Sequence, residues 1–126
     1  MIGREKKEYN DLFFVCSLIE YIGRKTKNHR NVVVNAIGKD KLQHLYELAD
    51  VYHSDNIDKV SDELIDNYHI KEGAFDNVSD SKYSIPTHWD IGKVYKRLII
   101  DICVKQGKES IETLVEVYNS WLSRKI

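Results

Sequence analysis

Apolar residues recur at helical spacing along most of the chain, and the segment 12–22 shows the pattern most strongly. One set returns every three or four positions, at Leu12, Val15, Cys16, Ile19 and Ile22, and a second set follows another face, at Phe13, Phe14, Leu18 and Tyr21. A helix that is apolar on two faces is normally covered on both. We therefore expect this helix at the centre of a bundle, with Gly23 as its stop.

The same spacing predicts further helices in the first half of the chain. A short helix is expected over 30–37, closed by Gly38, although the run of three valines at 32–34 would suit a strand equally well. Asp40 and Asn56 are placed to cap the next two helices. Their apolar stripes are Leu42, Leu45, Tyr46, Ala49 and Tyr52 for the first, and Ile57, Val60, Leu64, Ile65 and Tyr68 for the second.

The pattern breaks at residues 70–86, where Gly, Asp, Asn and Ser residues gather, and this segment is expected to form one long loop. Pro86 disfavours helical geometry before it, and Thr87 with Asp90 three positions on resembles a capping box. A helix should therefore begin here. Its stripe is Ile91, Val94, Tyr95, Leu98 and Ile102, and after Gly107 a last stripe follows at Ile111, Leu114, Val115, Tyr118 and Leu122.

These elements predict an all-α fold, a single compact bundle of five or six helices with one long loop near residues 70–86. The chain has 126 residues, of which 42% are hydrophobic, enough for one core, so residues 1–126 are expected to form a single helical domain. Two cysteines 87 positions apart in apolar segments indicate buried free thiols rather than a disulfide.

Charge and hydropathy exclude some classes of partner. The 19 basic and 20 acidic residues nearly cancel, so no overall field favours nucleic acid or a membrane surface. The longest apolar stretch, 12–19, is too short to cross a bilayer, and its flanks do not resemble a signal peptide. We expect a cytoplasmic protein with no membrane contact.

Local charge is more informative, because the two signs are segregated along the chain. Six basic residues stand against Asp40 alone between positions 24 and 41: Arg24, Lys25, Lys27, Arg30, Lys39 and Lys41. Ten acidic residues face two lysines between positions 47 and 80. The acidic stretch predicts a surface for a basic protein partner, with candidate contacts at Asp58, Asp62 and Asp66 and apolar anchors at Trp89 or Trp121.

The sequence gives weaker evidence for catalysis than for binding a protein partner. His53 with Asp55, and His88 with Asp90, could converge into a polar cluster that serves an enzyme or a toxin, provided the fold brings them together. Glycine-rich phosphate loops, nucleophile elbows, zinc-binding helices and paired Cys-x-x-Cys motifs do not occur in the sequence. The sequence therefore favours a protein without catalytic residues, cofactor or metal.

A third hypothesis is nucleic-acid binding. The segment 33–48 has the outline of a helix, a turn and a second helix with lysines at the turn, which is typical of a helix-turn-helix. Any two consecutive short helices give this outline, and the acidic stretch that follows would repel phosphate. Nucleic acid is therefore a disfavoured partner.

Three segments, "DLFFVCSLIEYIGRKTKN", "LADVYHSDNIDKVSDE" and "IPTHWDIGKVYKRLI", resemble an uncharacterised family of small, mostly helical proteins of low-GC gram-positive bacteria. Genes of that family often lie beside a small companion protein and a predicted ADP-ribosyltransferase-like protein, as in toxin-antitoxin or defence loci. The resemblance implies partner binding and names no catalytic residue. Family members continue past the last helix with a tyrosine-containing tail, which this sequence lacks.

The sequence thus predicts a cytoplasmic protein-interaction module, an antitoxin or a regulatory component of a toxin-antitoxin-like or defence locus. The alternatives are the enzyme or toxin with the His/Asp cluster and, third, the helix-turn-helix protein. A homo-oligomer stays open, because the central helix has two apolar faces that a second copy could cover.

Overall fold

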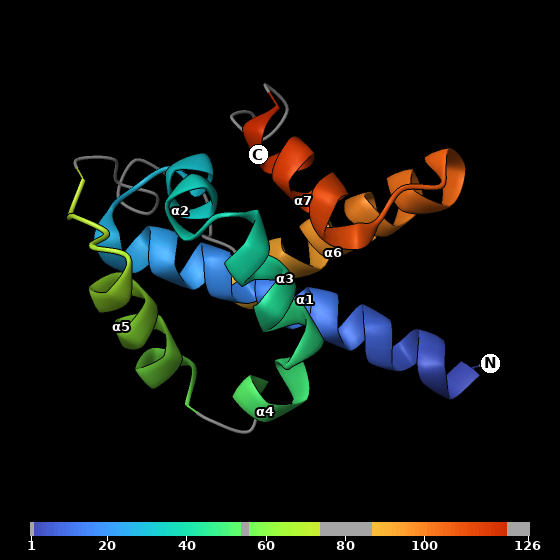
Figure 1. The fold of residues 1–126 in the computed structure, drawn as a ribbon, viewed down its shortest axis with the longest axis horizontal. Coiled ribbons are helices and arrows are strands. Elements are labelled where there is room, and N and C mark those ends of the chain that lie inside the picture. The colour runs from blue at the N-terminus through green and yellow to red at the C-terminus, as the bar shows by residue number, and fades with distance from the viewer. Residues whose placement is uncertain (1, 54–55, 74–86, 121–126) are drawn as a thin grey trace.

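The central helix is longer than predicted. In the computed structural model, which describes residues 2–53, 56–73 and 87–120, with side chains from residue 9 onward except that of His53, α1 spans Ile2–Thr26. It lies across the middle of the molecule, with α2 and α7 on one side and α4 and α5 on the other (Figure 1). Both of its apolar faces are covered, and seven side chains are at most 2% exposed: Leu12, Phe14, Val15, Cys16, Leu18, Ile19 and Ile22. The prediction of a central helix is confirmed.

The second long helix, α6 (His88–Gln106), packs against α1 more extensively than any other element of the described chain. The two backbones approach closely at Gly92. A Cβ atom there would lie 2.3 Å from Ser17 Oγ and 2.9 Å from Ser17 Cα. Only a residue without a side chain fits such a crossing, so Gly92 fixes how near α6 comes to α1.

Five shorter helices complete the fold: α2 (Arg30–Ile37), α3 (Lys39–Glu47), α4 (Ala49–His53), α5 (Ile57–Asn67) and α7 (Ser110–Asn119). The all-α bundle is therefore confirmed, and α2 is a helix despite its three valines. The described residues hold seven helices rather than five or six, because the stripe predicted for one helix is divided at Leu48 between α3 and α4. The predicted long loop falls mostly on residues 74–86, outside the described residues.

Two predicted helix starts are confirmed in atomic detail. The Asn56 side chain accepts a hydrogen bond from the Asp58 backbone N–H at 2.8 Å. Thr87 and Asp90 form a capping box, in which each side chain accepts from the backbone N–H of the other residue at 3.1 Å. Gly107 ends α6 in the left-handed conformation, as its place in the sequence predicts.

Two predicted helix boundaries are wrong, the end of α1 and the start of α3. Gly23 does not end α1, which continues to Thr26 and stops where Lys27 adopts the left-handed conformation with φ +57°. Two carbonyls of the last turn then accept bonds from beyond the helix: Asn28 N–H donates to Gly23 O at 3.0 Å and Gly73 N–H donates to Thr26 O at 2.7 Å. Asp40 does not cap α3 either. Gly38, with φ +87°, precedes that helix without a side-chain cap, and Asp40 lies in the first turn.

Candidate functional site: the acidic face of α5

The candidate site is built on α5, which separates apolar from acidic residues. Val60 and Leu64 are buried against the bundle, and Asn56 sets where the helix starts. The opposite side carries the acidic face, defined as Asp58, Asp62, Glu63 and Asp66, all of which are exposed. Helical spacing of three and four places these carboxylates beside one another.

Two of these carboxylates bind α1. Lys25 Nζ lies 2.5 Å from Asp58 Oδ1 and 2.5 Å from Asp62 Oδ1, and the Tyr21 hydroxyl donates to Asp58 at 2.7 Å. The hydrogen bonds from Lys25 and Tyr21 lower the pKa of Asp58. The same contacts raise the pKa of Lys25 and that of Tyr21. Asp58 and Asp62 thus help to hold α5 on α1 while staying accessible.

Asp66 and Glu63 have a different environment. Both are exposed, and within the described part of the chain neither lies in an ion pair. Of the three predicted contact aspartates, Asp66 is therefore the one whose charge faces solvent without an internal counterion. Glu63, which the sequence analysis did not select, joins it because it occupies the same outward face.

Some residues of the basic stretch form ion pairs with acidic residues of the same chain. Lys27 Nζ lies 3.8 Å from Glu72 Oε1, and the Arg30 guanidinium binds the Glu20 carboxylate. Together with Lys25, three basic residues of the region 24–41 therefore face acidic residues of the same chain. The basic and acidic stretches are less available to partners than their counts in the sequence indicate.

Trp89 belongs to an aromatic corner, defined as Phe13, Tyr21, His88 and Trp89, which meets the acidic face at Tyr21. The Trp89 ring centroid is 5.6 Å from that of Phe13 and 4.7 Å from that of His88, which in turn is 4.9 Å from Tyr21. Tyr21 belongs to both features, since its ring contacts His88 and its hydroxyl binds Asp58. The predicted apolar anchor Trp89 is half-buried, and His88 and Tyr21 lie between it and Asp58 of the acidic face.

The predicted His/Asp cluster is only partly described. Asp90 uses its carboxylate to cap α6, and the half-buried His88 points into the aromatic corner. Burial and the charge of Arg24 lower the pKa of His88. The side chain of His53 lies outside the described residues, as do Asp55 and the second predicted anchor, Trp121.

Sequence reasoning missed a buried polar cluster at the heart of the bundle. Glu20 is 3% exposed and accepts two hydrogen bonds from Arg30, whose guanidinium lies 5.4 Å from the Tyr95 ring centroid. Tyr95 stacks on Tyr118 at 4.3 Å, and the Tyr118 hydroxyl faces Cys16. A glutamate inside an otherwise apolar helix was the available signal, but spacing could not identify Arg30 as its partner.

Both cysteines are free of a disulfide, and they differ in environment. Cys16 is completely buried, as predicted, and burial raises the pKa of its thiol to about 12. Cys103 is only half-buried, because it lies where α6 leaves the core for the surface. The prediction that both thiols are buried is therefore right for Cys16 and wrong for Cys103.

Among the described residues, no three His, Cys, Asp or Glu side chains come together as a metal site would require. None of the helices in that part of the chain is both long enough and apolar enough to cross a membrane.

Comparison with known proteins adds no relative. The chain matches no protein-family model, and neither the curated proteins nor the solved structures contain a match.

Proposed function

We propose that this protein is a non-enzymatic interaction module that binds a basic surface of a partner protein through the acidic face of α5. In this proposal it acts in the cytoplasm as an antitoxin or regulatory component of a toxin-antitoxin-like or defence locus. The observation that carries the proposal is that one chain of contacts links the acidic face to Trp89: the Tyr21 hydroxyl binds Asp58, the Tyr21 ring packs on His88, and His88 packs on Trp89.

This arrangement has the composition of a protein interface. Exposed carboxylates attract a basic partner over several ångströms and set its orientation, and an adjoining aromatic side chain supplies the apolar contact that makes a complex last. Asp62 and Asp58 are 61% and 54% exposed even while bound to Lys25. They can therefore receive a further cation without leaving their place in the fold.

The geometry also decides which residues should be changed to test the proposal. Neutralising Asp58 would break its bonds to Lys25 and Tyr21, so a loss of binding could reflect a displaced α5. Glu63 and Asp66 have no such role. The double variant Glu63→Gln/Asp66→Asn removes two negative charges from the acidic face and leaves the α1 contacts in place.

The test is quantitative capture of proteins from a lysate of the cells that encode the chain, at low and at high salt. The control is Asp40→Asn/Glu112→Gln, which removes the same charge from exposed positions on α3 and α7. We expect a salt-sensitive partner that the control retains and that Glu63→Gln/Asp66→Asn retains about threefold less or weaker still. Equal capture by both variants would refute the proposed surface.

A further inference from the structure

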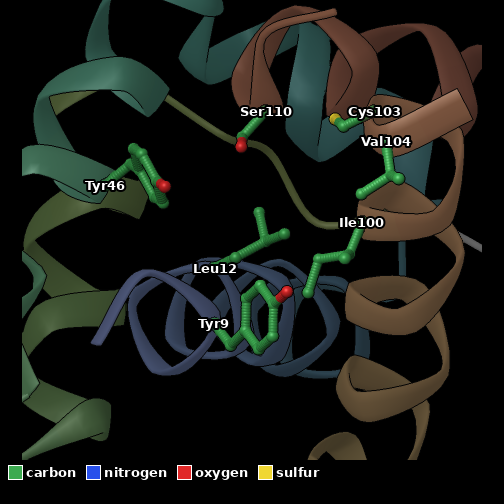
Figure 2. A pocket seen from close by; sticks show the side chains of 7 residues that line it. All are labelled: Tyr9, Leu12, Tyr46, Ile100, Cys103, Val104 and Ser110. Atoms are coloured by element: carbon green, nitrogen blue, oxygen red, sulfur yellow. The ribbon is translucent and has the colours of Figure 1, made fainter. Parts of the chain in front are cut away.

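A second feature is an open pocket between α1, α3, α6 and the start of α7. Figure 2 shows Tyr9 and Leu12 of α1 below it, Tyr46 of α3 at one side, and α6 opposite. Its volume is about 240 Å³, and its lining consists of Tyr9, Leu12, Tyr46, Ile100, Cys103, Val104 and Ser110. Every one of these side chains is uncharged.

This pocket continues into a second hollow along α6. The second hollow, of about 400 Å³, shares Tyr9, Ile100 and Val104 with the first and adds Lys96, Arg97 and Asp101. The two together form one groove with an apolar inner end and a charged outer end. Val104 is 76% exposed and Tyr9 is 38% exposed, so apolar surface is open to solvent along the shared part.

The outer end of the groove is positively charged. Asp101 is held by Lys105, whose Nζ lies 3.1 Å from Asp101 Oδ2, so its carboxylate is already partnered. Arg97 is exposed, Lys96 is half-buried, and Lys93 lies one turn away on the same helix. Burial lowers the pKa of Lys96, and the like charges of Arg97 and Lys93 lower it further.

We propose that this groove binds an amphiphilic monocarboxylate, an unbranched medium-chain fatty acid, with its hydrocarbon chain in the uncharged pocket and its carboxylate at Arg97 and Lys96. Arginine binds a carboxylate through two parallel hydrogen bonds, and an anion placed there relieves the repulsion among the cations. The chain removes the exposed apolar surface of Ile100 and Val104 from water. This site contains none of the α5 carboxylates, although Lys96 Nζ lies 5.7 Å from the ring centroid of Phe13 in the aromatic corner.

Cys103 provides a reporter inside the groove. Its thiol lines the uncharged pocket and is half-buried, whereas the other thiol, Cys16, is completely buried with its pKa raised to about 12. A thiol reagent added to the folded protein should therefore modify Cys103 alone. The variant Cys103→Ser, which should show no labelling, verifies that assignment.

The experiment measures the rate of Cys103 labelling with and without decanoate, below the concentration at which decanoate forms micelles. Bound decanoate should slow labelling by about tenfold, because its chain occupies the space in front of the thiol. Decanol carries the same chain without charge and should protect at concentrations about tenfold higher. Acetate should not protect. Unchanged labelling with decanoate, or equal protection by decanol, would overturn the proposal.

Two pairs of variants locate the ligand. Arg97→Gln should raise the decanoate concentration needed for protection by about tenfold, whereas Lys59→Gln, the same loss of charge on α5, should not change it. Val104→Asp should abolish protection, and Val94→Asp, an exposed position of α6 outside the groove, should leave it intact. Thermal unfolding of each variant verifies that it is folded.

A second copy of the chain is the competing occupant of an open apolar groove. Sedimentation of the wild-type protein and of Val104→Asp distinguishes the two. A monomer in both cases, with decanoate protection lost only in the variant, supports the fatty-acid site. A wild-type dimer that Val104→Asp dissociates, with no protection by decanoate, would overturn it.

Discussion

Two ion-pair clusters lie little more than one turn apart on α1, and they differ in almost every respect that determines energy. Glu20 is 3% exposed and binds Arg30, whose side chain is 17% exposed. Lys25 is 33% exposed and binds Asp58 and Asp62, which are 54% and 61% exposed. The first cluster is sealed under the stacked rings of Tyr95 and Tyr118, and the second faces solvent.

Burial, rather than the number of bonds, decides how much the loss of one partner in each cluster lowers the stability of the fold. A buried charge that loses its partner has no water to replace it, so the energetic penalty falls on the fold. An exposed pair exchanges its partner for water and ions at little cost. The same helix therefore carries a buried cluster in which the loss of one partner should be costly and an exposed cluster that can lose a partner at little cost and still receive another.

The largest effect is expected at the buried pair. Arg30→Met leaves the Glu20 carboxylate buried without its counterion and should lower the free energy of unfolding by about 3–5 kcal/mol. Glu20→Met/Arg30→Met removes both charges and should be more stable than the single variant. Urea unfolding of the three proteins measures this difference. A double variant less stable than the single one would contradict the role assigned to the pair.

The next largest loss of stability is expected at the close crossing of α6 over α1, the helix pair that places Tyr95 near Arg30. Gly92→Ala places a Cβ atom 2.9 Å from the backbone of Ser17 and should push α6 away from α1. We expect a loss of about 1–3 kcal/mol in the free energy of unfolding. Lys93→Ala, an exposed neighbour on the same helix, is the control and should change stability by less than about 0.5 kcal/mol. Equal stability of the two variants would show that the crossing is not tight.

A smaller effect is expected at the exposed cluster. Lys25→Gln removes the cation shared by Asp58 and Asp62 and should lower the free energy of unfolding by less than about 1 kcal/mol. The difference from wild type should shrink as salt is added, because the pair is open to solvent. Chemical denaturation at two salt concentrations measures it. A loss as large as that of Arg30→Met would remove the distinction between the clusters.

The smallest expected effect is a dependence on pH at the aromatic corner beside this cluster. The folded protein lowers the pKa of His88 from its ordinary value of 6.5, mainly through burial. The unfolded chain therefore binds the proton more tightly, so stability is greatest above pH 6.5 and falls as the pH drops below it. His88→Phe should remove this part of the pH dependence in thermal unfolding between pH 7 and pH 5. An unchanged slope would contradict the assignment.

Short-range features of the fold could be predicted from the sequence, because their causes are local. The cap at Asn56, the box formed by Thr87 and Asp90, and the burial of both faces of α1 each depend on residues within a few positions of one another. The end of α1 could not be predicted. It lies where Lys27, which is not a glycine, adopts the left-handed conformation, and the Thr26 carbonyl there binds the N–H of Gly73, nearly fifty positions later in the chain.

The candidate site was predictable to the same degree. Its acidic residues could be identified from composition, since exposed carboxylates follow from helical spacing on α5. Their internal partners could not, because Lys25 lies 33 and 37 positions away from Asp58 and Asp62. Only the fold separates these two aspartates from Glu63 and Asp66, whose charges have no partner among the described residues.

The proposed role of the acidic face is tested most directly by the rate at which the captured partner associates with the protein over a range of ionic strength. If exposed carboxylates steer the encounter, the rate falls steeply as salt increases. Glu63→Gln/Asp66→Asn should flatten that dependence, whereas Asp40→Asn/Glu112→Gln should leave it as in the wild type. The same slope for all three proteins would contradict the assignment of α5 as the binding surface.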